Sequence, residues 1–306
     1  MVCKIKEGVY DDMSDEVYHT QHSREEHFYS SSQLKTMLED PIKFRDQYIR
    51  NEKSPTPQGL QDAFDVGTLV HTAILEPEKL KGSYVVYTGA KRAGQEWTDF
   101  KEANKGKMII NKTMKASAEN AIKATNKSII AKALFKDGQA EQSFFVNFMG
   151  IKVKVRTDWL KRDYIVDGMN HDLSAIVDLK TTTGNVRDAI KTKNKVKQLN
   201  YDLSAAFYVD VVNYCIEYFD LDIPKVETFI WVFASKDKGG YCQAYDAKAY
   251  LEMGRAKYLK AIELIKKHEA NNWDFPEEII SLKPYGYELA DWIETKETAD
   301  NGESFL

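Results

Sequence analysis

The chain has 306 residues, 43% of them hydrophobic, and 43 Lys and Arg residues against 47 Asp and Glu residues give a net charge of −4. This composition allows a substantial core in one large domain or two small ones, and nothing in the overall charge indicates a polyanion partner. The longest apolar stretch, "AAFYVDVVNYCIEYF", is interrupted by Asp210 and Glu217, so we expect neither a signal peptide nor a membrane span, and a cytoplasmic location. Three widely spaced cysteines without a CxxC motif exclude a disulfide framework and a four-cysteine metal site.

The first half of the chain carries mainly helical signals. The predicted elements are helices within 28–49 with a break at Asp40-Pro41, a loop over 51–59, a helix over 60–80, a short strand and polar loop within 84–97, and helical structure over 98–135 interrupted near "NKGKMIINK". In the 60–80 helix, Phe64, Leu69 and Ile74 share the apolar side, and Pro77 ends it.

The pattern then changes to the period of a strand. Residues 143–160 alternate around a turn near Met149-Gly150, which predicts a hairpin. Its second strand has an apolar face and a polar face, made respectively of Ile151, Val153 and Val155, and of Lys152, Lys154, Arg156 and Asp158.

The remaining segments complete a mixed pattern of strands and helices. Strands are predicted within 164–168, 174–182, 226–235 and 240–246, and helices from about Gln198 to Phe219 and over 247–270. We therefore expect one α/β domain over 1–306, with a mainly helical N-terminal part in 1–135 and a sheet core with C-terminal helices in 136–306.

The strand "SAIVDLKTT" places an acid and a base two residues apart. Positions two apart point the same way, so Asp178 and Lys180 project from one face, and alone they could be an edge salt bridge. Asp158, 20 residues earlier, can come close to Asp178 from a neighbouring strand. Two converging carboxylates repel unless a cation such as Mg²⁺ or Mn²⁺ lies between them. Lys180 could then orient water on that metal, which is the equipment for phosphodiester hydrolysis.

Several segments resemble a known family. "RTDWL" before "VDLKTT" looks like the D…(D/E)xK core of the PD-(D/E)xK nuclease superfamily. The ordered segments "YSSSQLKTMLEDPIKF", "FDVGTLVHTAILEPE", "KVRTDWL" and "YDLSAAFY" resemble the RecE or exonuclease VIII type of phage exonuclease, over about Gly8 to Trp292. The resemblance implies a restriction-endonuclease-like mixed central sheet flanked by helices, with a helical N-terminal elaboration.

The resemblance also assigns site residues. It implies metal ligands at His71, Asp158, Asp178 and the main chain of Leu179, and catalytic roles for Asp158, Asp178, Lys180 and Glu141. Without the resemblance, a single helical histidine such as His71 would more often be a packed core residue. Glu141 matches a recurrent acid that precedes the hairpin.

DNA contacts are implied for a further set of residues: Ser31, Ser32, Lys35, Thr181, Lys193, Lys195, Gln198, Tyr201 and Tyr208. The serines and Lys35 at a helix N-terminus suit a terminal phosphate, although helix capping explains the serines nearly as well. The basic run from Arg187 to Lys197 is a solvated face if taken alone, and a phosphate-tracking edge in a nuclease. The family usually has a glutamine one turn before Tyr208, where this chain has Ser204.

The function implied is a Mg²⁺-dependent 5′-to-3′ exonuclease on double-stranded DNA ends, with Mn²⁺ able to substitute. It would leave 3′ overhangs for a RecT-like strand-annealing partner, as a homo-oligomeric ring in the cytoplasm of a bacterial host, during phage recombination. Three alternatives remain: an endonuclease or resolvase on the same fold, an inactive DNA-end-binding protein, and an α/β protein whose Asp and Lys pairs are structural.

Overall fold

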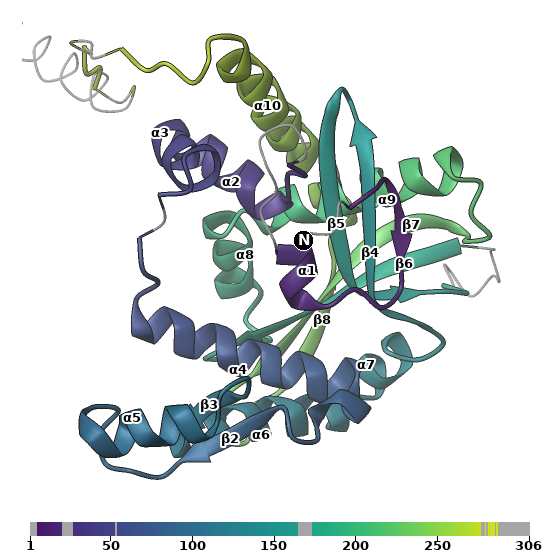
Figure 1. The fold of residues 1–306 in the computed structure, drawn as a ribbon. Helices are drawn as coiled ribbons and strands as arrows, with labels where there is room; N and C mark the ends of the chain where they lie inside the picture. Colours follow the sequence, from purple (N-terminus) through teal and green to yellow (C-terminus); the bar gives the residue numbers. More distant parts are fainter. Residues whose placement is uncertain are drawn as a thin grey trace, which may run out of the picture. The chain divides into compact units, whose positions relative to one another are not determined.

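The computed structural model describes residues 5–19, 27–52, 54–164, 173–276, 279, 281–284 and 286. The chain forms two compact units, Met1–Asn271 and Asn272–Leu306, and the elements described below all belong to the first (Figure 1). The single nuclease domain expected over 1–306 stays a prediction. No helix among the described residues combines the length and the apolar character that crossing a membrane requires.

The helices and strands alternate as the mixed pattern predicts. The α-helices are α1 (Asp15–His19), α2 (Ser31–Glu39), α3 (Pro41–Phe44), α4 (Gln58–Leu75), α5 (Gly94–Ala103), α6 (Lys112–Lys127), α7 (Ile129–Leu134), α8 (Ala189–Gln198), α9 (Tyr201–Tyr218) and α10 (Leu251–Ala270). Short π- and 3₁₀-turns cover Arg45–Ile49, Pro77–Leu80 and Lys248–Tyr250. The strands are β1 (Gly8–Tyr10), β2 (Tyr84–Tyr87), β3 (Met108–Asn111), β4 (Gly138–Phe148), β5 (Ile151–Lys161), β6 (Leu173–Thr182), β7 (Lys225–Ser235) and β8 (Cys242–Asp246).

A six-stranded sheet in the order β1-β4-β5-β6-β7-β8 forms the centre of this unit. Only β6 and β7 run parallel within it, and the other neighbours are antiparallel. The β4–β5 hairpin turns at Met149 and Gly150, both with positive φ (53° and 80°), so the predicted two-residue turn is confirmed. The predicted fold class, a mixed sheet flanked by helices, is confirmed.

Helices cover both faces of the sheet. Val177 and Leu179 of β6 pack with Val70 of α4 and with α6 in one apolar core. On the opposite face, Tyr201 of α9 lies against Phe233 of β7, with ring centroids 6.3 Å apart. Consecutive β6 residues alternate between these layers, so Asp178 and Lys180 face the α9 side, where the Lys180 ammonium lies 5.4 Å from the centroid of the Tyr201 ring.

Three local expectations differ from the structure, and a fourth falls almost wholly outside the described residues. Phe64, expected on the apolar side of its helix, is 54% exposed. The helix expected from about Gln198 to Phe219 is α9 and begins only at Tyr201, because Asn200 adopts a left-handed conformation with φ of 47°, and the residues before it form the separate helix α8. The break at "NKGKMIINK" contains β3, which pairs parallel with β2. The strand expected within 164–168 lies outside the described residues except for its first position.

Candidate metal and catalytic centre

The candidate centre lies where β5 and β6 separate. Their ladder pairs Leu160 with Ile176 and Trp159 with Val177 and ends there, so the next facing positions in the same register are Asp158 and Asp178. Beyond that point, the Oδ2 of Asp158 accepts a hydrogen bond from the main-chain N–H of Leu179 at 2.8 Å. A carboxylate thus takes the place of a ladder partner, and the main chain of Leu179 faces the opening between the strands.

A histidine from α4 reaches the same opening. The Nε2 of His71 lies 2.5 Å from the carbonyl oxygen of Leu179, and its Nδ1 lies 3.4 Å from the Oδ2 of Asp158. If Nε2 carries the proton, it donates a hydrogen bond to the Leu179 carbonyl. The unprotonated Nδ1 can then bind a cation beside Asp158. The structure therefore brings three of the predicted metal ligands together: His71, Asp158 and the main chain of Leu179.

Glu141 enters from the other side of β5. The β4–β5 pairs Ala140–Trp159 and Gln142–Thr157 flank it, so Glu141 stands opposite Asp158. Its φ is 48°, in the left-handed region that a non-glycine residue rarely adopts, and such conformations cluster at functional sites. Ligand atoms of His71, Glu141 and Asp158 all lie within 4.8 Å of one another. Glu141, predicted as a catalytic acid, thus shares a ligand cluster with two predicted metal ligands.

The pKa of Glu141 is raised to about 8, first by burial and next by the Asp158 carboxylate. Arg156 opposes this rise from 4.0 Å away. The guanidinium of Arg156 is itself buried, stacks over the Tyr18 ring at 4.0 Å and pairs with Asp15 at 2.6 Å. The sequence pattern predicts Arg156 on the polar face of its strand, without a functional role. Asp158 is two residues further along the strand, so the same alternation places both side chains on that face.

Asp178 and Lys180 form a second group on the α9 side. The ammonium of Lys180 donates to the Oδ1 of Asp178 at 2.6 Å, while the buried Oδ2 has no hydrogen-bond partner among the described residues. Burial raises the pKa of Asp178, and Asp158 adds to the rise while Lys180 opposes it. Burial alone would lower the pKa of Lys180, but Asp178 and Asp158 outweigh it and raise that pKa. Lys180 therefore stays an ammonium at neutral pH. Asp178, predicted as a metal ligand, is not in the cluster of three.

Tyr201 connects this pair to α2. Its ring lies 5.4 Å from the ammonium of Lys180 and 5.2 Å from that of Lys35, measured to the ring centroid. The pKa of Lys35 is lowered to about 8 by burial and by the nearby Lys180. Of the predicted DNA-contacting residues, Lys35 and Tyr201 thus lie beside the candidate catalytic lysine.

The other predicted DNA-contacting residues are spread over four elements, α2, β6, α8 and α9. Ser31 is buried and its hydrogen bond with Tyr208 partly offsets the effect of burial, which raises the pKa of Tyr208 to about 12. Ser32 is exposed on α2, and Thr181 follows Lys180 with its Oγ1 directed at Gly67 of α4.

The lysines of the basic run lie on α8. Lys193 and Gln198 are exposed there, while Lys195 donates to the Thr182 hydroxyl and, at 3.1 Å, to the Thr183 carbonyl at the end of β6. Ser204 lies partly exposed on α9, one turn before Tyr208. Their contacts with DNA stay predictions.

These residues fit a divalent cation. One imidazole nitrogen, two carboxylates and a main-chain carbonyl are the donor set that hard and borderline divalent ions accept. A cation beside Glu141 and Asp158 would also relieve the repulsion that helps raise the Glu141 pKa. The Oδ2 of Asp178, the second oxygen of the carboxylate that Lys180 contacts, is buried and has no hydrogen-bond partner among the described residues.

The raised pKa of Glu141 predicts a pH-dependent stability. The folded chain keeps a proton there that the unfolded chain releases near 4.5, so stability falls as the pH rises from about 4.5 to about 8. Without divalent ions, Glu141→Gln should therefore stabilise the protein at pH 8 by about 1 to 3 kcal/mol, roughly 3 to 10 °C in Tm, and have little effect at about pH 4. Thermal unfolding followed by circular dichroism measures this.

The matched control is Glu119→Gln, an exposed glutamate on α6, which should leave Tm unchanged at both pH values. Mn²⁺ should raise the Tm of the wild-type protein and of this control but raise that of Glu141→Gln less. Equal Tm changes for Glu141→Gln at both pH values would show that the carboxyl is not held protonated.

Comparison with known proteins agrees with this geometry. Residues 30–276 match the family model described as "PDDEXK-like domain of unknown function (DUF3799)". No curated protein matches the sequence. Among solved structures, a crystal structure from Eubacterium rectale, described as a "putative exonuclease", has a TM-score of 0.56 at 16% identity and covers 91% of this chain and 98% of that one, which shows a shared fold. The chain belongs to this PDDEXK-like domain family and thereby to the PD-(D/E)xK nuclease superfamily.

Proposed function

We propose that this protein is a Mg²⁺-dependent 5′-to-3′ exonuclease that acts on double-stranded DNA ends and leaves 3′ single-stranded overhangs, with Mn²⁺ as a substitute ion. The observation that carries the proposal is the convergence of His71, Glu141 and Asp158 at the opening between β5 and β6, beside the Asp178–Lys180 pair. The "putative exonuclease" description of a protein with the same fold, and the resemblance to RecE-type exonucleases, support the exonuclease assignment.

The chain's own residues have separate tasks in this reaction. A bound divalent ion supplies Lewis-acid polarisation of a phosphodiester and lowers the pKa of water. His71, Glu141, Asp158 and the Leu179 carbonyl would hold it. Lys180, fixed by Asp178 and flanked by Tyr201, offers N–H donors to a phosphate oxygen or to the attacking water. Because it stays protonated, Lys180 acts as a cation that offsets developing negative charge and not as a general base.

The biological setting follows from the same resemblance. Resection to a 3′ overhang prepares DNA for a single-strand annealing protein of the RecT type, during phage or prophage recombination in the bacterial cytoplasm. A homo-oligomeric ring around the DNA would keep a net acidic chain on its substrate, since its channel can be basic while the outside is negative.

Linear duplexes labelled at each 5′ or 3′ end, incubated with and without Mg²⁺ and followed on a gel, test the proposal. We expect Mg²⁺-dependent release of the 5′ label in short products first, while the 3′ label stays on strands that shorten progressively from their 5′ ends. A closed circular duplex should stay intact. Cleavage of the circle would identify an endonuclease, and tight binding of intact linear DNA in Mg²⁺ would identify an end-binding protein; either result overturns the exonuclease proposal.

A further inference from the structure

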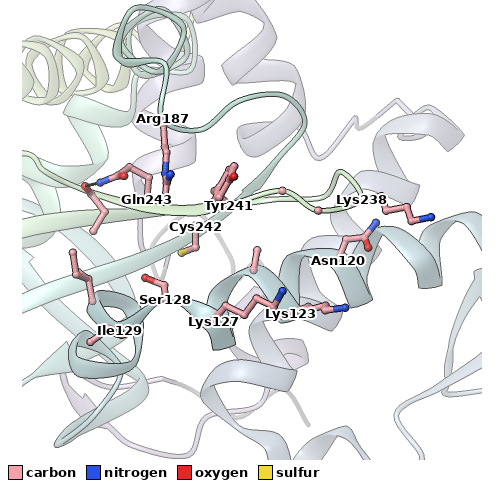
Figure 2. A pocket seen from close by; sticks show the side chains of 15 residues that line it. Asn120, Lys123, Lys127, Ser128, Ile129, Arg187, Lys238, Tyr241, Cys242 and Gln243 are labelled. Atoms are coloured by element: carbon pink, nitrogen blue, oxygen red, sulfur yellow. Dashed lines mark hydrogen bonds between the residues drawn. The ribbon is translucent and has the colours of Figure 1, made fainter.

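A large groove lies near the loop that follows β6, the strand that carries Asp178 and Lys180. It has a volume of about 930 Å³ and lies between α6, the start of α7 and the β7–β8 turn (Figure 2). Lys123, Lys127 and Ile129 line its helical side, and Lys238 and Tyr241 line the side of the turn. None of these residues belongs to the metal and catalytic centre.

The groove concentrates positive charge on a net acidic chain. Lys123, Lys127, Arg187 and Lys238 line it, and none of the described lining residues carries a carboxylate. The neighbouring carboxylate of Asp237 already accepts a hydrogen bond from the Gly184 N–H at 2.6 Å. A ligand that satisfies this surface must therefore be an anion with several charges spaced along its length.

The groove also offers an aromatic surface. The guanidinium of Arg187 stacks over the Tyr241 ring at 4.0 Å, and the ring is 53% exposed. Ile129, 85% exposed, adds an apolar surface across the groove (Figure 2). Flat rings and guanidinium planes among cations form a platform for nucleobases, which a single strand exposes and a duplex hides within its own stack.

The groove is tied to the strand that carries Asp178 and Lys180. β6 ends at Thr182, and the loop that follows bonds to the β7–β8 turn through Gly184 and Asp237 before it delivers Arg187 to the groove. The loop that follows β6 and the β7–β8 turn therefore hold Arg187 at the edge of the groove.

We infer that this groove binds single-stranded DNA, with phosphates on Lys123, Lys127 and Lys238 and bases on Tyr241. The strand it holds is the uncut strand that the nuclease reaction releases, and this origin rests on the proposed function. Binding itself needs no catalysis, so it is measured separately from cleavage.

Fluorescence anisotropy of a labelled oligo-dT in EDTA tests the inference, with K123E/K127E and Tyr241→Ala as groove variants. K123E/K127E should raise Kd by roughly tenfold or more. It should also reduce the magnitude of the negative slope of log K against log salt concentration by about 1.4, since each of the two lost phosphate contacts contributes about 0.7. Tyr241→Ala should also raise Kd about tenfold but leave the salt slope unchanged. Thermal unfolding should show wild-type Tm, because these side chains are exposed.

The matched control is K112E/K132E, which makes the same charge change with exposed lysines of α6 and α7 outside the groove. Its Kd should stay within about twofold of wild type. Equal weakening by both double variants, wild-type affinity in K123E/K127E, or a duplex that binds as tightly and is unaffected by Tyr241→Ala would each overturn the inference. If the labelled duplexes stay uncut but the oligo-dT result holds, the groove stands and the nuclease proposal fails.

Discussion

Replacement of Asp178 with asparagine should reduce Mg²⁺-dependent DNA cleavage by roughly a thousandfold or more. Asparagine keeps the shape of the side chain but removes the negative charge that holds the ammonium of Lys180 at 2.6 Å. It also removes the charge shared by the buried Oδ2, which has no hydrogen-bond partner among the described residues. Both the position of Lys180 and the field at the ligand cluster change, although His71, Glu141 and Asp158 remain.

Gel analysis of an end-labelled linear duplex measures this loss, and anisotropy with the same duplex in EDTA should show nearly unchanged binding. Asp99→Asn, an exposed aspartate on α5, makes the same chemical change away from the centre and should cleave like the wild type. If Asp178→Asn retained activity within about tenfold of wild type at saturating Mg²⁺, Asp178 would have no catalytic part.

Local patterns were sufficient to predict the elements that carry the centre. The alternation in 143–160 predicts the β4–β5 hairpin, and the buried run around Asp178 predicts β6. Side-chain parity then places Asp178 and Lys180 on one face, as the structure has them. These features depend on residues near one another in sequence, so the periodicity of apolar and polar residues is enough to predict them.

The arrangement of the acids depends on how strands meet, which no local pattern contains. β5 and β6 separate after the pair Trp159–Val177, and this frees the main chain of Leu179 to meet Asp158 and His71. Glu141 joins the cluster through a left-handed backbone conformation that its residue type does not indicate. We expect Asp178 as a metal ligand and Glu141 as a catalytic acid, whereas the structure groups Glu141, and not Asp178, with His71 and Asp158. Both assignments stay predictions.

Two other differences have identifiable physical causes. The helix predicted from about Gln198 to Phe219 begins only at Tyr201, because Asn200 leaves the helical region, and asparagine is among the few residues that tolerate φ above zero. No element is predicted before residue 28, yet β1 and α1 form there, and Tyr18 of α1 packs with Phe28 and Phe145 in a small separate core. The sequence signal for this packing was Tyr18, an aromatic residue that follows the acidic residues Asp15 and Glu16.

Replacement of Lys180 with methionine should lower the rate constant for cleavage by several orders of magnitude while metal binding persists. Methionine keeps an unbranched apolar side chain and removes the charge. Because Asp178 and Asp158 raise the pKa of Lys180, its ammonium is present throughout the range from about pH 6 to pH 9. The wild-type rate should therefore not fall in this range through loss of a proton from Lys180.

Lys35→Met is the informative comparison, since the ammonium of Lys35 lies near the same Tyr201 ring as that of Lys180. Its pKa of about 8 means that its ammonium is lost as the pH rises through that value. DNA binding by the wild-type protein should weaken above about pH 8, and Lys35→Met should bind more weakly at neutral pH but lack this change. KM should rise in Lys35→Met with little change in kcat, whereas kcat should fall in Lys180→Met.

Loss of Lys180 leaves the buried Asp178 without its counter-charge, so Tm must be measured alongside the rate. The double variant D178N/K180M removes both charges, should recover much of any lost stability and should remain inactive. An inactive, stable double variant assigns the loss to chemistry and not to unfolding. Near wild-type degradation by Lys180→Met would refute the role of this ammonium, because no other lysine among the described residues bonds to Asp178.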